Sequence, residues 1–308
     1  MFIVLVNRNA GWTRGQDLGR LLARLERVIG ADGRVIVTRH PDEVDDALAG
    51  LAAADVTALV PVGGDGTLAR VLTAACARWG ADALPAELPL RAGTMNMVAL
   101  DARQGRREAP LDTLARVVRA HRSGRTPSLT ERALLRSDCG RAGFVAGLGM
   151  PTRFLRHYDA RGGGFRQALS TLFQYSGSAL VRGGLAQALF EPLAATLTVD
   201  DGPARALSPS LLLAMTVDTL PLGFRVGQAT ASAGMTLVQG RPDPVRLVAS
   251  LPLIHRGYLP ASVGVERLTC LRLTLDFAEP QPWQLDGDIL PATRRLALDA
   301  SARVRLLV

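Results

Sequence analysis

Hydrophobic residues in the first third of the chain follow two alternating spacings. Short apolar runs predict buried strands at 2–6, 34–38 and 56–62. Apolar residues that recur every three or four positions predict helices at 18–29, 41–54, 68–79 and 111–121. Alternation of strand and helix is typical of a parallel sheet covered by helices, and such sheets bind ligands at the carboxyl ends of their strands.

After a polar segment at 121–127, the pattern changes to short apolar runs separated by turn residues. These runs lie at 133–136, 142–146, 195–199, 210–217, 235–238, 270–277 and 296–308. Short strands at such spacing predict an antiparallel sandwich or a curled sheet. We therefore expect an α/β domain with a parallel sheet at residues 1–128 and a β-rich antiparallel sandwich domain at 129–308.

One helical pattern interrupts the second, β-rich part of the chain. Its apolar face is formed by Phe165, Leu169, Leu172, Phe173 and Leu180, with arginines nearby. Such a face either touches lipid at a membrane surface or covers a sheet, and the second arrangement is the more common one.

The segment Gly63-Gly64-Asp65-Gly66-Thr67 lies between the third predicted strand and a helix. Glycines there allow a tight turn and a close approach of the backbone to a ligand, and free N–H groups at a helix start bind phosphates. A carboxylate beside a phosphate needs a cation between them, so Asp65 points to Mg²⁺. The alternative is an ordinary turn in which Asp65 or Thr67 caps the helix.

Two more polar turns also follow predicted strands, at residues 7–11 and 93–96. The carboxyl ends of parallel strands meet at one edge of a sheet, so we expect all three turns to form one crevice.

The composition narrows the chemistry further. All 36 basic residues of the 308-residue chain are arginines, and the formal net charge is +8. Without lysine there is no Walker A loop, no protein-kinase strand lysine and no Schiff base. The charge suits a nucleotide or an anionic membrane surface. Nucleic acid is not an expected partner, because aromatic residues make up only 5% and no nucleic-acid motif is present.

The apolar start of the chain, Met1 to Val6, is too short for a signal peptide, and no window approaches the ~18 apolar residues of a membrane span. We expect a cytoplasmic protein that associates with membranes only peripherally.

With these motifs placed, the chain resembles the diacylglycerol kinase catalytic-domain family, the soluble lipid kinases related to sphingosine and ceramide kinases. The resemblance is carried by Gly63 to Thr67, by Gly93-Thr94-Met95-Asn96 and by Asp286-Gly287-Asp288, with a looser match at Asn7 to Gly11. The first motif is shared with NAD kinases and phosphofructokinases, whereas the second motif about 30 residues later narrows the resemblance to lipid kinases.

The resemblance implies an ATP- and Mg²⁺-dependent kinase acting on a hydroxyl of a diacylglycerol-like lipid, with a role in lipid metabolism and phospholipid biosynthesis. It implies ATP binding by Asn7, Gly11, Thr38, Gly63, Gly64, Asp65, Gly66, Thr67, Gly93, Thr94 and Asn96. Asp65 would belong to the Mg²⁺ network at the phosphates, and Asp288 would be the general base. Asp286 would hold the metal or the loop. Exposed sheet edges in the second domain would allow two copies of the chain to pair as a homodimer.

The chain departs from the family pattern at three places. The late triplet normally ends in Glu, and here it ends in Asp288, one methylene shorter. Ala69-Arg70 replaces a common Asn-Glu pair, and the segment 228–234 lacks the Asp of a structural Mg²⁺ site. Taken alone, Asp286-Gly287 would indicate only a hairpin turn.

Two other functions remain open from the sequence. An NAD-kinase-like phosphotransferase shares the first glycine motif, but its second motif is not found in this chain. A non-catalytic nucleotide- or lipid-binding homologue is consistent with the altered triplet and the missing Asp.

Overall fold

A computed structural model describes residues 1–93, 95–102, 108–125, 127–159, 174, 177–178, 183–226 and 234–308. The chain forms two compact units. The first comprises Met1–Arg132, Gly140–Gly143 and Ala302–Val308, and the second comprises Ala133–Cys139 and Phe144–Ser301. The predicted division after residue 128 placed the last residues of the chain in the second domain, whereas Ala302–Val308 belong to the first unit.

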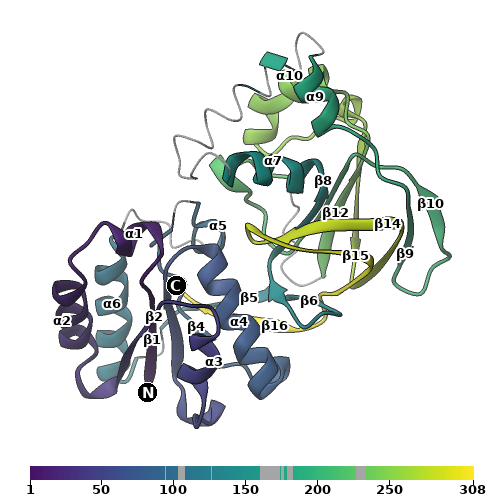
Figure 1. The fold of residues 1–308 in the computed structure, drawn as a ribbon. Coiled ribbons are helices and arrows are strands. Elements are labelled where there is room, and N and C mark those ends of the chain that lie inside the picture. Colours follow the sequence, from purple (N-terminus) through teal and green to yellow (C-terminus); the bar gives the residue numbers. More distant parts are fainter. Residues whose placement is uncertain are drawn as a thin grey trace. The chain divides into compact units, whose positions relative to one another are not determined.

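The first unit contains a six-stranded, mostly parallel sheet (Figure 1). Its strand order is β2-β1-β3-β4-β16-β5, and the pairs β1–β2, β1–β3, β3–β4 and β4–β16 are parallel. The strands are β1 (Phe2–Asn7), β2 (Gly33–Thr38), β3 (Ala58–Val62), β4 (Ala86–Glu87), β5 (Leu129–Ala133) and β16 (Arg303–Leu307).

Helices cover both faces of this sheet (Figure 1). They are α1 (Gly11–Arg14), α2 (Leu18–Ile29), α3 (Glu43–Leu48), α4 (Asp65–Trp79), α5 (Met97–Asp101) and α6 (Pro110–Arg122). On one face, the apolar sides of α2 and α6 pack against alternate residues of β1 and β3, and this forms a fully buried core. The predicted α/β domain is therefore confirmed.

The second unit is built around an antiparallel sheet with strand order β13-β12-β11-β8-β14-β15-β6, and β9 and β10 branch from β14. Its strands are β6 (Leu135–Ser137), β8 (Val145–Gly149), β9 (Ala195–Val199), β10 (Arg205–Leu207), β11 (Leu211–Met215), β12 (Met235–Gly240), β13 (Val265–Cys270), β14 (Arg272–Leu285) and β15 (Asp288–Asp299). The β-rich second part is confirmed, and its described strands belong to one continuous sheet.

Three helices of the second unit lie in the described ranges: α7 (Met150–Asp159), α9 (Gly184–Leu189) and α10 (Pro244–His255). The buried core of this unit surrounds Trp283 and includes Leu148, Leu237 and Leu275. The short strand β7 (Ala142–Gly143) belongs to the first unit, where Thr73 of α4 bonds to the backbone of Ala142. The five apolar residues of the predicted helical face (Phe165, Leu169, Leu172, Phe173 and Leu180) and the segment 228–233 lie outside the described residues.

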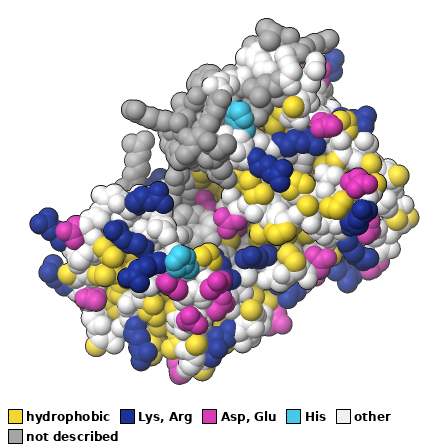
Figure 2. Space-filling model, viewed as in Figure 1, with side chains coloured by type: hydrophobic (Ala, Val, Ile, Leu, Met, Phe, Trp, Pro, Cys, Tyr) yellow, Lys and Arg dark blue, Asp and Glu magenta, His cyan; other side chains and the backbone are white. Residues whose placement is uncertain are grey.

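No helix in the described ranges has both the length and the apolar character needed to cross a bilayer. Arginine side chains are spread over the visible surface and interspersed with acidic ones (Figure 2).

Candidate active site

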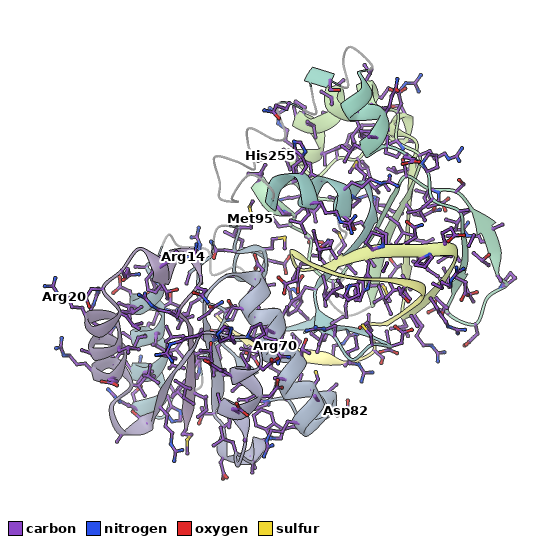
Figure 3. The ribbon with its side chains drawn as sticks, viewed as in Figure 1. Arg14, Arg20, Arg70, Asp82, Met95 and His255 are labelled. Atoms are coloured by element: carbon purple, nitrogen blue, oxygen red, sulfur yellow. The ribbon has the colours of Figure 1, made fainter. Side chains whose placement is uncertain are left out.

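The carboxyl ends of β1 and β3 bring the first two predicted turns into contact. The Asn7 side chain donates from Nδ2 to the hydroxyl of Thr67 over 2.9 Å. Its Oδ1 accepts the backbone N–H of Asn9, also at 2.9 Å. One amide side chain thus shapes its own turn and fixes the start of α4. Figure 3 shows Arg14 and Met95 at this same edge of the first unit.

The glycine turn after β3 leads into α4 without a side-chain cap. Gly64 occupies the N-cap position in an extended conformation and provides no side-chain cap, and its carbonyl accepts the N–H groups of Thr67 and Leu68. Backbone N–H groups at the start of this long helix therefore remain available to an anion. The alternative in which Asp65 or Thr67 caps α4 does not fit this geometry.

Gly93 has no room for a side chain because the turns at 63–67 and 93–96 meet backbone to backbone, and Gly63 has none because of the Thr67 side chain in its own turn. A Cβ built on Gly93 would lie 2.3 Å from the Cα of Gly64. A Cβ on Gly63 would lie 2.2 Å from the hydroxyl oxygen of Thr67. Neither separation is possible for real atoms, so a side chain at Gly93 would push the two turns apart, and one at Gly63 would displace Thr67 within its own turn.

The second turn is closed by Asn96, whose side chain bonds to Gly93 in both directions. Its Oδ1 accepts from the Gly93 N–H at 2.7 Å, and its Nδ2 donates to the Gly93 carbonyl at 2.6 Å. Asn96 has φ 51°, a left-handed conformation that asparagine tolerates better than most residues. Thr94 lies outside the described residues.

Asp65 joins the two turns through its carboxylate. Its Oδ2 accepts the N–H of Met97 at 3.1 Å and its Oδ1 accepts the N–H of Val98 at 3.2 Å, which are the first residues of α5. Burial raises the pKa of Asp65, and the backbone hydrogen bonds act in the opposite direction. The N–H groups of Asp65 itself and of Asn96 also act on this carboxylate, so it interacts with four backbone N–H groups. The side chain thus positions the second turn, and its carboxylate oxygens are of the kind that bind a divalent cation.

The other residues predicted to bind ATP in this unit lie nearby in the fold. Thr38 is buried at the end of β2, and its carbonyl accepts the Arg8 N–H at 2.9 Å. Gly11 is the first residue of α1. A Cβ on Gly11 would have no heavy atom within 4 Å, so packing does not require glycine there.

Arg8 is a candidate that the sequence analysis did not single out. It follows β1 directly, between Asn7 and Asn9. Its Nη1 atom is buried and has no hydrogen-bond partner in the part of the chain that the structure describes. The sequence offered one signal, because Arg8 lies within the turn at residues 7–11 that was predicted to reach the site.

Arg70, which departs from the family pattern, has a structural role. Its guanidinium forms an ion pair with Asp45 of α3, and its Nε donates to the Pro41 carbonyl at 2.8 Å. Figure 3 shows this side chain on α4. The arginine ties α4 to α3 and its preceding loop.

The late triplet forms a tight hairpin between β14 and β15. Leu285 pairs with Asp288, and the two residues between them have positive φ, 47° at Asp286 and 94° at Gly287. Two consecutive positive φ values define a type I′ turn, for which Asp-Gly is a preferred pair. The turn interpretation of this pair is correct as geometry, and it leaves Asp288 exposed at the start of β15.

Asp286 is buried and holds this hairpin against β8. Its Oδ2 accepts the Phe144 N–H at 2.9 Å and its Oδ1 accepts the Val145 N–H at 2.8 Å. The Asp286 N–H in turn donates to the Val145 carbonyl at 2.9 Å. Of the two roles foreseen for Asp286, this geometry favours holding the loop over holding a metal.

A metal centre made of side chains alone is not found among the described residues, because no three His, Cys, Asp or Glu side chains gather at one point. Phosphate oxygens, however, supply several ligands to Mg²⁺ in kinase sites, so one or two carboxylates suffice. Asp65 fits that requirement better than Asp286.

A mostly parallel α/β sheet followed by an antiparallel β sheet is the fold of the NAD and diacylglycerol kinases. Residues 1–125 match the family model described as the diacylglycerol kinase catalytic domain. A search of curated protein sequences finds no match to the chain.

Solved structures match over nearly the whole chain. Two come from Bacillus anthracis strain Sterne. One, described as a putative diacylglycerol kinase, is 12% identical, covers 99% of this chain and 96% of its own, and has a TM-score of 0.70. The other, described as a diacylglycerol kinase, has the same identity and coverage and a TM-score of 0.66. Yeast NADH kinase is 9% identical, covers 100% of this chain and 83% of its own, and has a TM-score of 0.52. At these identities the likeness shows the fold.

Proposed function

We propose that this protein transfers the γ-phosphoryl group of ATP to a hydroxyl group of a diacylglycerol-like lipid. The observation that carries the proposal is the contact between the two glycine turns, which Asp65 closes through the backbone of α5. Phosphoryl transfer demands mainly positioning and neutralisation of phosphate charge, and closely packed backbone turns with free N–H groups provide both. The family match of residues 1–125 gives this geometry its reaction class.

The residues have distinct roles in this proposal. Backbone N–H groups at Gly64 and Gly66 bind phosphate oxygens, and Asp65 lies close enough to them to share a divalent cation. Mg²⁺, when bound with ATP, neutralises the phosphates during transfer. Asp288, exposed at the tip of its hairpin, takes the proton of the acceptor hydroxyl.

Arg8 supplies a cation to the phosphates in a chain that contains no lysine. A guanidinium whose buried Nη1 lacks a partner among the described residues gains a charge-assisted hydrogen bond when a phosphate binds. Arg8→Gln is expected to weaken ATP binding about ten-fold or more, because a hydrogen bond to a charged group contributes roughly 1.5–3 kcal/mol. Calorimetric titration with ATP measures the change, and Arg20→Gln on exposed α2 is the control. Equal affinities in the two variants would remove Arg8 from the site.

The proposal is tested by incubating purified protein with labelled ATP, Mg²⁺ and detergent-dispersed lipids. The acceptors are diacylglycerol, monoacylglycerol, ceramide, sphingosine and phosphatidylglycerol, with NAD as the non-lipid acceptor. We expect label in one lipid. Label in NAD alone would make the protein an NAD kinase.

A second function is favoured by one specific observation, the aspartate at position 288. Its carboxylate is one methylene shorter than the glutamate that usually ends this triplet, and a base displaced by about 1 Å loses much of a contribution of roughly 10²–10⁴-fold. A nucleotide-binding homologue without kinase activity would bind ATP in the titration and label no acceptor. In that case Asp288→Glu is the first variant to assay for restored transfer.

A further inference from the structure

One region of the second unit combines exposed apolar side chains with backbone strain. The C-terminal end of α10 and the preceding loop 219–225 lie side by side there, because the Arg225 N–H donates to the Ile254 carbonyl at 3.2 Å. We refer to Leu222, Phe224, Leu253 and Tyr258 together as the apolar tip. Tyr258 is 63% exposed and Leu253 is 41% exposed, and both belong to the small set of large hydrophobic residues so exposed in the described ranges.

The loop is a closed turn that holds its apolar residues in fixed positions. Thr219 and Arg225 form an isolated antiparallel bridge, and the Leu220 N–H donates to the Phe224 carbonyl at 2.7 Å. The Phe224 ring packs edge-on against His255, with ring centroids 5.8 Å apart. Figure 3 shows His255 at this end of the second unit.

Leu222 at the end of this turn has φ 63°, a left-handed conformation. For a residue with a Cβ this conformation costs roughly 1–2 kcal/mol. The neighbouring Gly223 has φ 80° and meets no such cost. A glycine or asparagine would therefore suit position 222 better for stability, and the leucine carries strain that folding alone does not explain.

The helix end presents its own two members of the apolar tip together. The Tyr258 N–H donates to the Leu253 carbonyl at 3.0 Å, so the chain folds back on the last turn of α10. Gly257, with φ 91°, permits this reversal and lies close to Arg225.

The charges around the apolar tip have one sign. Segments 219–226 and 251–258 contain no acidic residue, while Arg225 and Arg256 lie within them and are exposed. Two carboxylates flank these segments. Asp243 accepts the Arg246 N–H at the other end of α10, and the Oδ1 atom of Asp218 is buried. Exposed leucine and tyrosine surrounded by arginine match the boundary between lipid headgroups and acyl chains.

We propose that the apolar tip inserts into the surface of an anionic lipid bilayer, with Arg225 and Arg256 contacting the headgroups. This rests on the proposed function, since a kinase for a diacylglycerol-like lipid must reach an acceptor that resides in a bilayer. The inference identifies the apolar tip as the surface of the chain that contacts the bilayer. Tyrosine is suited to this place because its ring is apolar and its hydroxyl stays in water.

The test measures binding to vesicles in the absence of nucleotide. Vesicles of phosphatidylcholine alone and of equal parts phosphatidylcholine and phosphatidylglycerol are mixed with protein and separated by flotation. We expect wild-type protein to float with the anionic vesicles and to be released by salt. The double variant Leu253→Ser, Tyr258→Ser is expected to lose binding ten-fold or more. Arg256→Gln is expected to lose about five-fold, the equivalent of about 1 kcal/mol per arginine near such a surface.

Matched controls come from the same unit. Leu271 is 44% exposed and lies between β13 and β14, so Leu271→Ser removes a leucine of equal exposure elsewhere. The Arg294 side chain is 64% exposed on β15, so Arg294→Gln removes an arginine outside the tip. Both controls are expected to bind vesicles as the wild type does, and thermal unfolding confirms that every variant is folded.

The outcomes separate this proposal from the proposed function. If the protein labels a dispersed lipid but does not bind anionic vesicles, membrane insertion of the apolar tip is contradicted and the proposed kinase activity is supported. If the protein binds vesicles through the apolar tip but labels no acceptor, membrane insertion is supported and the proposed kinase activity is contradicted. A wild-type dimer in sedimentation that the double variant converts to a monomer would make this face a contact between copies and overturn the lipid assignment.

Discussion

Gly64 and Gly93 show most directly how single residues build the candidate site. They stand about 30 residues apart in the sequence, and each turn depends on the absence of a side chain in the other. No local sequence pattern predicts this contact, because the need for glycine arises only when the folded sheet brings the ends of two strands together. The glycine motifs predict phosphate binding, and the fold adds the reason why Gly93 cannot carry a side chain.

Gly93→Ala is expected to weaken both the fold and ATP binding. Its Cβ would lie 2.3 Å from the Gly64 Cα, and backbone cannot rotate away as a side chain can. Strain of this kind costs roughly 1–3 kcal/mol. Denaturant unfolding and ATP titration measure the two effects. Gly15→Ala, whose Cβ would meet its nearest atom at 3.9 Å, is the control. Equal stability of both variants would contradict the close contact.

Glu87 is the most unusual titratable residue of the first unit. Its side chain is fully buried on β4, between Leu59 of β3 and Leu306 of β16, and neither carboxylate oxygen has a partner among the described residues. Burial raises the pKa of Glu87 well above its usual range. The folded protein therefore keeps this carboxyl group protonated to a higher pH than the unfolded chain does.

The raised pKa of Glu87 fixes the sign of a pH dependence. The folded state keeps a proton that the unfolded chain releases near pH 4.5, so this contribution to stability is full below that pH and is lost as pH rises toward the folded pKa. The slope approaches about 1.4 kcal/mol per pH unit in that window. Glu87→Met is expected to flatten the profile and to raise stability at neutral pH. Unfolding free energies measured across the pH range check this, and an unchanged slope in the variant would contradict it.

At the scale of elements, the regular patterns predicted the first unit well and its irregular ends less well. The helix expected at 41–54 ends at Leu48, since Gly50 has φ 76° and breaks the pattern. Helix α4 begins at Asp65 rather than Leu68, because the glycines of its first turn carry no apolar spacing. The strand at 303–307 was predicted, but apolar alternation cannot tell which sheet a strand joins.

The hairpin at Asp286 and Asp288 carries one carboxylate with a structural role and one for which we propose a catalytic role. Asp286→Asn replaces one acceptor oxygen by an NH₂ group that faces a backbone N–H, so it is expected to cost roughly 1–3 kcal/mol of stability. Asp288→Asn changes an exposed residue and is expected to stay within about 0.5 kcal/mol of the wild type. Denaturant unfolding of the two variants side by side checks the difference. An equal loss in both would contradict the assignment of roles.

At the scale of the whole molecule, the chain leaves the first unit, forms the second and returns to the first. Its last strand, β16, pairs with β4 in parallel, and Val304 and Leu306 are fully buried there. The N-terminal family match ends at residue 125, so this final strand lies outside the matched region while completing the same sheet.

Leu306→Ala is therefore expected to destabilise the first unit, although position 306 is remote in sequence from every glycine turn. Loss of a buried leucine costs roughly 2–5 kcal/mol. Hydrogen exchange of the β1 and β3 amides is expected to accelerate, whereas the amides of β11 and β12 in the second unit keep their rates. Arg305→Gln, at an exposed position of the same strand, is the control. Faster exchange confined to the second unit would contradict the assignment of β16.

The measurement that tests the central claim most directly is phosphate transfer from labelled ATP to dispersed lipid, with ATP binding measured separately on the same protein. Wild type is compared with Asp288→Asn. The account predicts a labelled lipid with the wild type, and loss of labelling with unchanged ATP affinity in the variant. Equal labelling by both proteins would contradict the role of Asp288, and ATP binding without any labelled lipid would contradict the kinase.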